Sequence, residues 1–145
     1  TFDGTNEATT FGNDTSLDFE SNESFSICGW FYFNSFTNAT LINKALGSDI
    51  NYKLFISGSK LRFYMADAFS VNSIVTQSTT TLSTGQWYHF AHSYNGNGLA
   101  SGCQMYINGV SATTTSLIDS LGAGSVVVTD PLRLMSNGST FANVV

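Results

Sequence analysis

The chain has 145 residues, a formal net charge of −5 and only 10% charged residues, whereas 14% of its residues are aromatic. A chain of this length buries roughly two thirds of its unfolded surface, so residues 1–145 are expected to form a single domain. Five Lys and Arg side chains are too few to favour nucleic acid or an anionic membrane as partner. No apolar stretch approaches the ~20 residues needed for membrane insertion.

The expected elements are β-strands, because no segment keeps apolar residues at the three- and four-residue spacing of a helix. The first long strand, Ser24–Phe33, is apolar on both faces. One face carries Phe25, Ile27, Phe31 and Phe33, and the other carries Cys28, Trp30 and Tyr32. In a two-sheet sandwich the outer set needs cover from a loop, another domain or a ligand, unless a loop or a β-bulge resets the alternation.

Further strands follow along the chain. A hairpin is expected with its turn at Ser57-Gly58-Ser59, since glycine supplies the positive φ of such turns. We expect its residues Leu61, Phe63 and Met65 in the core. The strands expected before Ser73 are Thr40–Ala45, Tyr52–Ser57 and Lys60–Ala66. After it come an edge strand at Ser73–Thr81, central strands at Gln86–Tyr94 and Cys103–Ile107, a loop at Asn95–Gly102, an irregular segment at Ser111–Gly124, and strands at Val126–Thr129 and Leu132–Met135.

The residues from Gly85 to Gly96 form an aromatic-rich strand between two turns, and Met105–Val110 contains an Asn-Gly hairpin turn. This sequence pattern resembles the laminin-G-like branch of the concanavalin-A-like lectin/glucanase superfamily. The matching positions are Trp87, His89, Ala91, Tyr94 and Gly96, with further agreement at Phe2–Gly4, Phe25–Phe31, Leu41–Lys44 and Ser57–Phe63. The resemblance implies an all-β fold, an antiparallel two-sheet β-sandwich of jelly-roll type.

The resemblance runs from about Thr1 to about Ser136. Members of the family usually end with one more strand that pairs beside the first, and residues 141–145 do not resemble it. Without that strand a sheet edge keeps unpaired backbone groups, which promotes association. We therefore expect the chain to be part of a longer polypeptide, or else to be completed by a neighbouring subunit.

Because some members of the superfamily are glucanases, paired carboxylates are the first catalytic candidates. A glycoside hydrolase needs two of them, ~5–5.5 Å apart for retention and wider for inversion. The glutamates Glu7, Glu20 and Glu23 all precede the first long strand, and Asp18 alternates with Glu20. We interpret that pair as a solvated face and expect no enzyme activity, a degenerate hydrolase being the weakest alternative.

The histidines and cysteines are expected to be structural. His89 and His92 are three residues apart on one strand, so they point to opposite faces and cannot share a metal ion. His89 is expected to be a packed, hydrogen-bonded imidazole, since the laminin-G-like pattern has a histidine at this position of its core strand. Cys28 and Cys103 could form one disulfide, but we favour free thiols because spacing alone fixes no distance between them.

The resemblance implies calcium as the cofactor, held at the rim by Asp, Asn and backbone oxygens. Asp3 and Asn137 could approach each other because the first and last strands are neighbours in this fold, and Asp67 and Asn95 are alternatives on other loops. For a glycan or protein ligand, the residues expected at rim loops or in stacking are Tyr52, Tyr64, Asn95, Asn97 and Tyr106.

The resemblance thus implies a non-catalytic recognition module that binds glycan or protein surfaces through rim loops. Such modules are accessory domains of secreted, cell-surface or virion proteins. The alternative is a structural domain of a virion or surface layer that packs on neighbouring subunits. The low charge and the doubly apolar strand Ser24–Phe33 suit this alternative.

Overall fold

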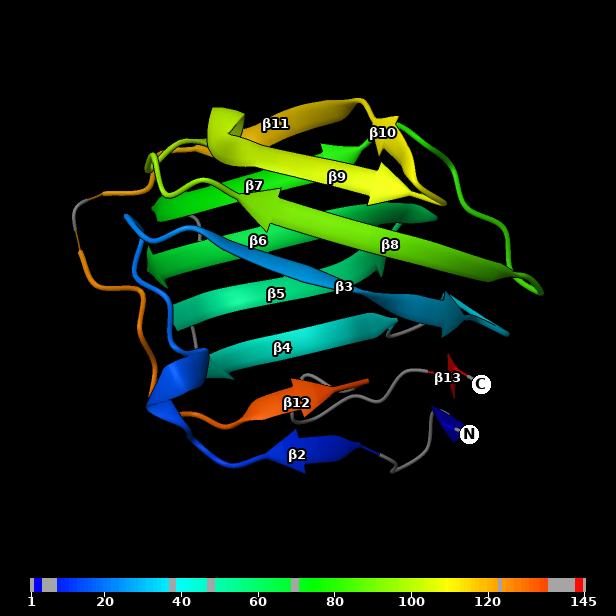
Figure 1. Cartoon of the computed structure of the whole chain (residues 1–145), viewed down its shortest axis with the longest axis horizontal. Helices are drawn as coiled ribbons and strands as arrows, with labels where there is room; N and C mark the ends of the chain where they lie inside the picture. Colours follow the sequence, from blue (N-terminus) through cyan, green and yellow to red (C-terminus); the bar gives the residue numbers. More distant parts are fainter. Residues whose placement is uncertain are drawn as a thin grey trace.

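The fold is seen in a computed structural model, which describes residues 2–3, 8–36, 39–46, 49–68, 71–122, 124–135 and 143–144. Strands dominate it, together with two single-turn 3-10 helices, η1 (Thr15–Leu17) and η2 (Ala100–Gly102). Two antiparallel sheets face each other as the layers of a sandwich (Figure 1). The all-β jelly-roll expectation is confirmed.

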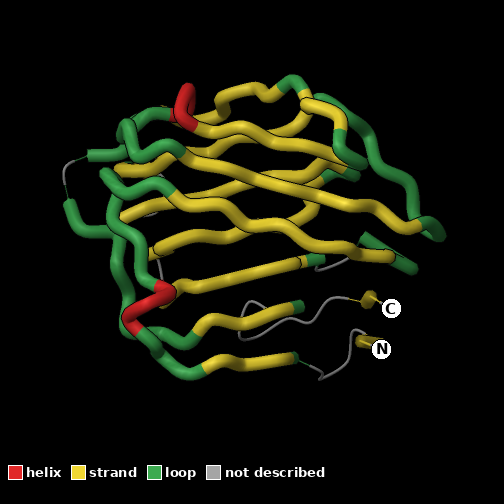
Figure 2. The backbone as a smooth tube through the Cα atoms, viewed as in Figure 1, coloured by secondary structure: helices red, strands yellow, loops and turns green. Residues whose placement is uncertain are grey.

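The larger sheet has seven strands, and the smaller sheet has four (Figure 2). In spatial order the seven are β11 (Thr114–Asp119), β7 (Asn72–Ser78), β6 (Lys60–Ala68), β5 (Asp49–Ser57), β4 (Thr40–Leu46), β12 (Leu132–Leu134) and β2 (Thr9–Phe11). The four are β10 (Val110–Ala112), β9 (Cys103–Ile107), β8 (Trp87–Tyr94) and β3 (Phe25–Tyr32).

The hydrophobic core fills the space between the sheets. Leu61, Phe63 and Met65 alternate along β6 and are fully buried, as expected from their shared face. Phe31 of β3 stacks on Tyr88 of β8, with 5.6 Å between ring centroids. The β5–β6 hairpin turns through Gly58 and Ser59, which both have positive φ, so the expected turn is confirmed.

Three expectations about the strands were wrong. The segment Ser111–Gly124 is not irregular, because it contains most of β10 and all of β11. Since β11 pairs outside β7, the strand expected at Ser73–Thr81 is not an edge strand. The segment Val126–Thr129 forms no strand, although Val126 and Val128 are buried. Its apolar pattern reflects packing of a loop on the core rather than sheet pairing.

The two ends of the chain meet at one end of the sandwich (Figure 1). Strand β1 (Phe2–Asp3) pairs with β13 (Asn143–Val144), and Phe2 lies opposite Val144. The sequence predicted no strand beside the first, so this two-residue pairing corrects that expectation. It is too short for its residues to show the pattern of a strand.

Lys44 of β4 is fully buried, and oxygen atoms surround its ammonium group. Its Nζ lies 2.8 Å from a carboxylate oxygen of Asp18. It donates hydrogen bonds to Asn13 Oδ1 at 2.8 Å, to the Asp130 carbonyl at 3.0 Å and, at 3.5 Å, to the Val128 carbonyl. One side chain thus joins the loops on either side of η1 to the loop before β12.

Candidate functional site

The outer surface of the four-stranded sheet exposes large aromatic side chains. Strand β3 pairs with β8 without a register shift from Phe25 to Tyr32, so no bulge resets its alternation. Phe25 and Phe31 are therefore buried, whereas Trp30 points outward and is 65% exposed. The outer set of β3, which was expected to need cover, is Cys28, Trp30 and Tyr32, and no described segment covers it.

Strand β8 adds a second row of aromatic side chains to this surface. Trp87 is 54% exposed and packs on Tyr32, with 5.7 Å between ring centroids. His89 lies opposite Trp30, and their rings meet edge to face at 5.2 Å. Tyr106 of β9 is 37% exposed. We call this surface the aromatic face and define it by Trp30, Tyr32, Trp87, His89 and Tyr106.

A shallow, open hollow of about 590 Å³ lies on the aromatic face, lined by Trp30, Trp87, His89, Asn108 and Gly109. The β9–β10 turn forms one wall, and Asn108 and Gly109 both have positive φ, as a tight Asn-Gly hairpin requires. The turn is fixed to β8, because Asn108 Oδ1 accepts the His89 N–H at 2.9 Å and the His89 carbonyl accepts the Asn108 N–H at 2.7 Å.

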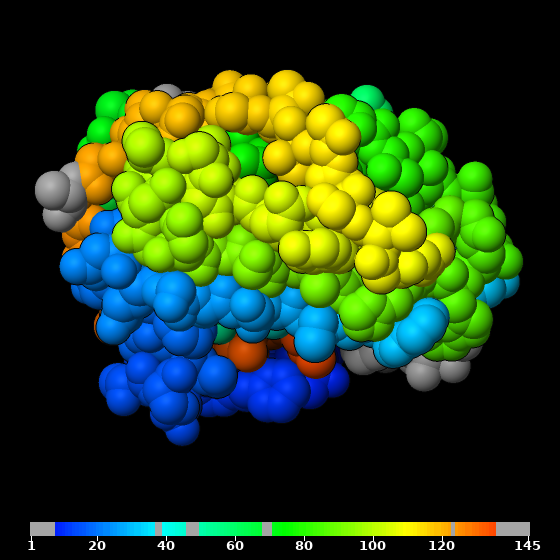
Figure 3. Space-filling view, turned by 45° about the horizontal axis from the view of Figure 1, so that its top comes forward, coloured from blue at the N-terminus to red at the C-terminus, as the bar shows by residue number. Residues whose placement is uncertain are grey.

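The aromatic face is free of charged side chains. None of the residues of β3, β8, β9 and β10 is Asp, Glu, Lys or Arg. All five cations of the chain belong to the other sheet, namely Lys44, Lys53, Lys60, Arg62 and Arg133. Figure 3 shows the strands of this face side by side, from β3 in blue to β10 in yellow, and no described segment crosses them.

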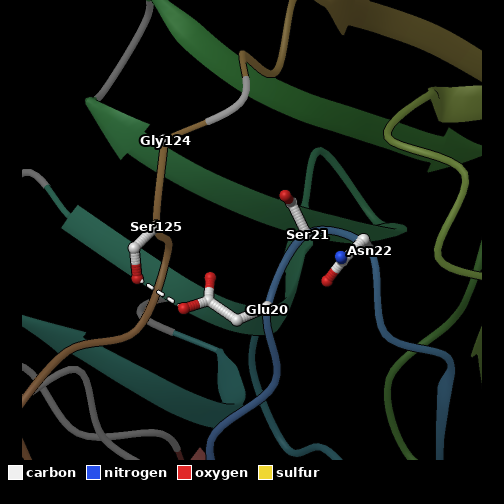
Figure 4. Close-up of a pocket in the computed structure, with 5 residues that line it drawn as sticks. All are labelled: Glu20, Ser21, Asn22, Gly124 and Ser125. Atoms are coloured by element: carbon white, nitrogen blue, oxygen red, sulfur yellow. Dashed lines mark hydrogen bonds between the residues drawn. The ribbon is translucent and has the colours of Figure 1, made fainter.

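A second, polar hollow of about 330 Å³ lies at the rim where β8 ends, opposite the β9–β10 turn (Figure 4). It is lined by Glu20, Ser21, Asn22, Gly124 and Ser125. The Glu20 carboxylate accepts hydrogen bonds from Ser125 Oγ at 2.7 Å and from the Val126 N–H at 3.3 Å. The structure thus already uses the one charged group of this hollow to hold two loops together.

The loop after β8 is tied tightly to the same rim. The Tyr94 hydroxyl donates to the Ser21 carbonyl at 2.6 Å and accepts the Gly98 N–H at 2.7 Å. Gly96 has φ +77°, and a Cβ there would lie 2.6 Å from the Asn22 carbonyl oxygen. The side chain of any other residue would collide with backbone at this point.

Gly96→Ala is therefore expected to destabilise the protein by about 2–3 kcal/mol, because backbone strain and the clash with Asn22 add. The matched control is Gly98→Ala, where φ is +74° but a Cβ meets nothing within 4 Å, so its cost is expected to be about 1 kcal/mol. Urea unfolding measures both free energies. Equal costs would show that contact with Asn22 does not matter.

The residues predicted to bind a ligand are not brought together. Tyr52 and Tyr64 are only 2% and 7% exposed, so neither can stack on a sugar ring. Asn95 and Asn97 lie at the rim, and their Oδ1 atoms accept the N–H groups of Asn97 and Leu99, at 3.1 Å and 3.0 Å. Tyr106 alone of the predicted five lies on the aromatic face.

The sequence pointed to part of the aromatic face and missed the rest. The alternation in the doubly apolar strand predicted that Cys28, Trp30 and Tyr32 share one face, and the structure shows that this face is the outer one. Trp87 and Asn108 were not predicted as site residues. The available signal was alternation in β8, which places Trp87 and His89 on one face and Tyr88 on the other.

Calcium binding at Asp67 and Asn95, the candidates whose side chains lie within the described residues, stays a prediction. Calcium takes six to eight oxygen ligands. Asp67 Oδ2 accepts a hydrogen bond from Asn72 Nδ2 at 3.4 Å, and no three His, Cys, Asp or Glu side chains gather within the described ranges. Asn137 and the side chain of Asp3 lie outside the described residues. Calcium at Asp3 and Asn137 stays a prediction.

The carboxylates weighed for catalysis have structural partners. Asp18 pairs with Lys44, and Glu20 accepts hydrogen bonds from Ser125 and Val126. The geometry therefore favours the interpretation of these acids as parts of the scaffold.

His92 is the histidine of the core, whereas His89 is half-buried and packs edge to face on Trp30, in agreement with the packed imidazole expected there. His92 is fully buried and stacks on Phe63, with 3.9 Å between ring centroids. Burial lowers the pKa of His92 to about 3.

The two cysteines are free thiols, as favoured from the sequence. Cys28 is exposed, whereas Cys103 is buried. Burial raises the pKa of the Cys103 thiol to about 12.

Within the described residues, no helix has the length and apolar character needed to cross a membrane.

Solved structures of other proteins share this fold, and two of them illustrate it. Domains LG4-5 of the mouse laminin alpha1 chain match with a TM-score of 0.67 and 14% identity, over 99% of this chain and 38% of that chain. The binding domain of Paraclostridial Mosquitocidal Protein 1 matches with a TM-score of 0.68 and 17% identity, over 98% of this chain and 35% of that chain. The chain thus spans just over a third of each matched structure. No curated protein sequence matches it.

The family model that matches the chain covers residues 3–140, nearly its whole length. It describes the laminin-G-like group of the concanavalin A-like lectin/glucanases superfamily. The architecture agrees, since two antiparallel sheets face each other across one core. The chain therefore belongs to the laminin-G-like group of the concanavalin A-like lectin/glucanases superfamily.

Proposed function

We propose that the chain is a non-catalytic recognition module that binds a glycan or a protein surface with its aromatic face. The observation that supports this most is the exposure of both Trp30 and Trp87 beside one hollow. Exposed tryptophans lose contact with water on binding, and they are the commonest energetic anchors of interfaces. Placing such side chains in solvent has no role in packing this core.

Similarity to known proteins supports recognition as the kind of function. One matched structure is, by its name, the binding domain of a mosquitocidal protein. By the same reasoning from the family, we propose that the module acts outside the cell, at a cell surface or on a virion. The site that we propose differs in position from the expected rim loops, because the Glu20 carboxylate and the Oδ1 atoms of Asn95 and Asn97 at the rim already accept hydrogen bonds within the chain.

The double variant Trp30→Ala/Trp87→Ala is expected to lose binding while it stays folded. Both side chains are largely exposed, so the free energy of unfolding should change by no more than about 1 kcal/mol. Arrays of glycans and of extracellular proteins measure the binding of the wild type and the variant. Phe11→Ala is the matched control, since Phe11 is an exposed aromatic of the other sheet.

Unchanged binding by the double variant would move the site to the rim loops. Another outcome would support the alternative of a structural domain that packs on neighbouring subunits. If the wild type binds neither array and light scattering finds an assembly that the double variant cannot form, the aromatic face is a contact between subunits. Either result would overturn recognition by the aromatic face.

A further inference from the structure

The absence of charge on the aromatic face constrains its ligand. A sulfated, phosphorylated or carboxylated ligand binds through Lys and Arg, which form charge-assisted hydrogen bonds with its anionic groups. All five cations of the chain lie in the seven-stranded sheet, and β3, β8, β9 and β10 hold no charged residue. An anion would lose its hydration here without gaining a partner. The complementary ligand is uncharged.

The hollow combines flat apolar rings with a few polar groups. Trp30 and Trp87 lie on neighbouring strands. They are diagonal to each other, because Trp30 lies opposite His89 and Trp87 lies opposite Tyr32, two positions further along the pair β3 and β8. The face of an aromatic ring carries negative charge density, which attracts the polarised C–H groups of a sugar ring. His89 and Asn108 line the same hollow. Since Asn108 Oδ1 is bonded to the His89 N–H, the NH2 end of the amide is left as a donor.

The rigidity and size of the hollow also fit a small ligand. Two hydrogen bonds to the backbone of His89 hold Asn108 against β8. Ring contacts hold Trp30 against His89 and Trp87 against Tyr32. The hollow of about 590 Å³ is within the ~300–1,000 Å³ typical of small-ligand sites.

We infer that the aromatic face binds an uncharged glycan, whose sugar rings stack on Trp30 and Trp87 and whose hydroxyls bond to Asn108 and His89. This inference rests on the proposed function and narrows it to one class of ligand. It assigns the stacking energy to the two tryptophans and the orientation of the sugar to the β9–β10 turn.

The two tryptophans of the chain are both on the aromatic face, so tryptophan emission, excited at a wavelength where the six tyrosines do not absorb, reports on this site alone. The probes are cellohexaose, mannohexaose and N-acetylchitohexaose as uncharged glycans, with a heparin hexasaccharide as the anionic counterpart. At least one uncharged probe is expected to shift the tryptophan emission in a saturable way. The shift should be insensitive to salt, because no ion pair forms.

Variants assign the contacts. Trp30→Phe and Trp87→Phe leave one reporter each, and each is expected to keep weaker binding. Trp30→Ala and Trp87→Ala should each lower the affinity about tenfold or more, as removal of an aromatic anchor does. Asn108→Gly keeps a residue suited to positive φ and removes the amide, so it should weaken binding without unfolding the turn. Phe11→Ala should change nothing.

Three results would overturn the inference. The first is that no uncharged probe changes the emission. The second is that only heparin binds, with an affinity that falls as salt rises. The third is that a protein from the array binds through Trp30 and Trp87 while no glycan does, which would leave the proposed function standing and reject the glycan as its ligand.

Discussion

Replacing Lys44 with methionine is expected to lower the free energy of unfolding by about 3 kcal/mol, because it leaves the carboxylate of Asp18 without its partner. The ammonium group also bonds to Asn13 and to the Asp130 carbonyl. Methionine has a similar length but no donor, so these oxygens would lose their bonds inside the protein. Urea unfolding, followed by circular dichroism, measures the loss.

Two further variants separate the role of Lys44 from general effects of the substitution. Lys60→Met makes the same change at a half-buried position of the same sheet, and it should cost about 0.5 kcal/mol or less. Lys44→Met/Asp18→Asn removes both charges and should recover part of the stability. Equal losses for Lys44→Met and Lys60→Met would show that the oxygen-lined site of Lys44 does not stabilise the fold.

The second large effect is a loss of stability in acid that depends on His92. Its pKa is about 3 in the folded protein, and burial is the cause, whereas a solvated histidine has a pKa near 6.5. The unfolded chain therefore binds a proton in the window between these values and the folded protein does not. The contribution of neutral His92 to the free energy of unfolding is therefore fully present above pH ~6.5. It falls by up to about 1.4 kcal/mol per pH unit as the pH drops toward 3.

The comparison with His92→Leu isolates this contribution from that of the carboxylates. The variant keeps a side chain of similar size against Phe63 and Phe25 but cannot be protonated. The difference in unfolding free energy between wild type and variant should change by about 2–3 kcal/mol between pH 6.5 and 4.5. Phe11→Leu, at an exposed position of the other sheet that cannot be protonated, is the control and should keep the wild-type slope. If His92→Leu kept it too, the buried histidine would not be the titrating group.

Local patterns predicted much of the fold correctly. The alternation Leu61, Phe63, Met65 placed the core face of β6, and the Ser57-Gly58-Ser59 turn fixed its hairpin with β5. These features depend on neighbouring residues, so a short stretch of sequence contains them. Strands β10 and β11 were not predicted, because their small, polar residues are also typical of loops.

The candidate site depended more on tertiary contacts. Tyr64 points away from the core residues of β6, as predicted, and was therefore a candidate for exposure. It is nevertheless buried, in a second cluster with Ile50, Ala66 and Val75 on that side of the sheet. Neighbours from β5 and β7 produce this burial. No pattern within β6 could show which strands would lie beside it.

The sequence by itself determined the class of fold, the family and the two sets of residues on opposite faces of β3, since alternation and turn residues are local properties. Which of the two apolar faces of β3 meets water, which histidine is buried, and where Trp30 and Trp87 meet Asn108 were decided only by the tertiary structure. Each depends on the pairing of strands far apart in sequence, here β3 with β8 and β8 with β9. Register between such strands places side chains side by side, and a linear pattern leaves it open.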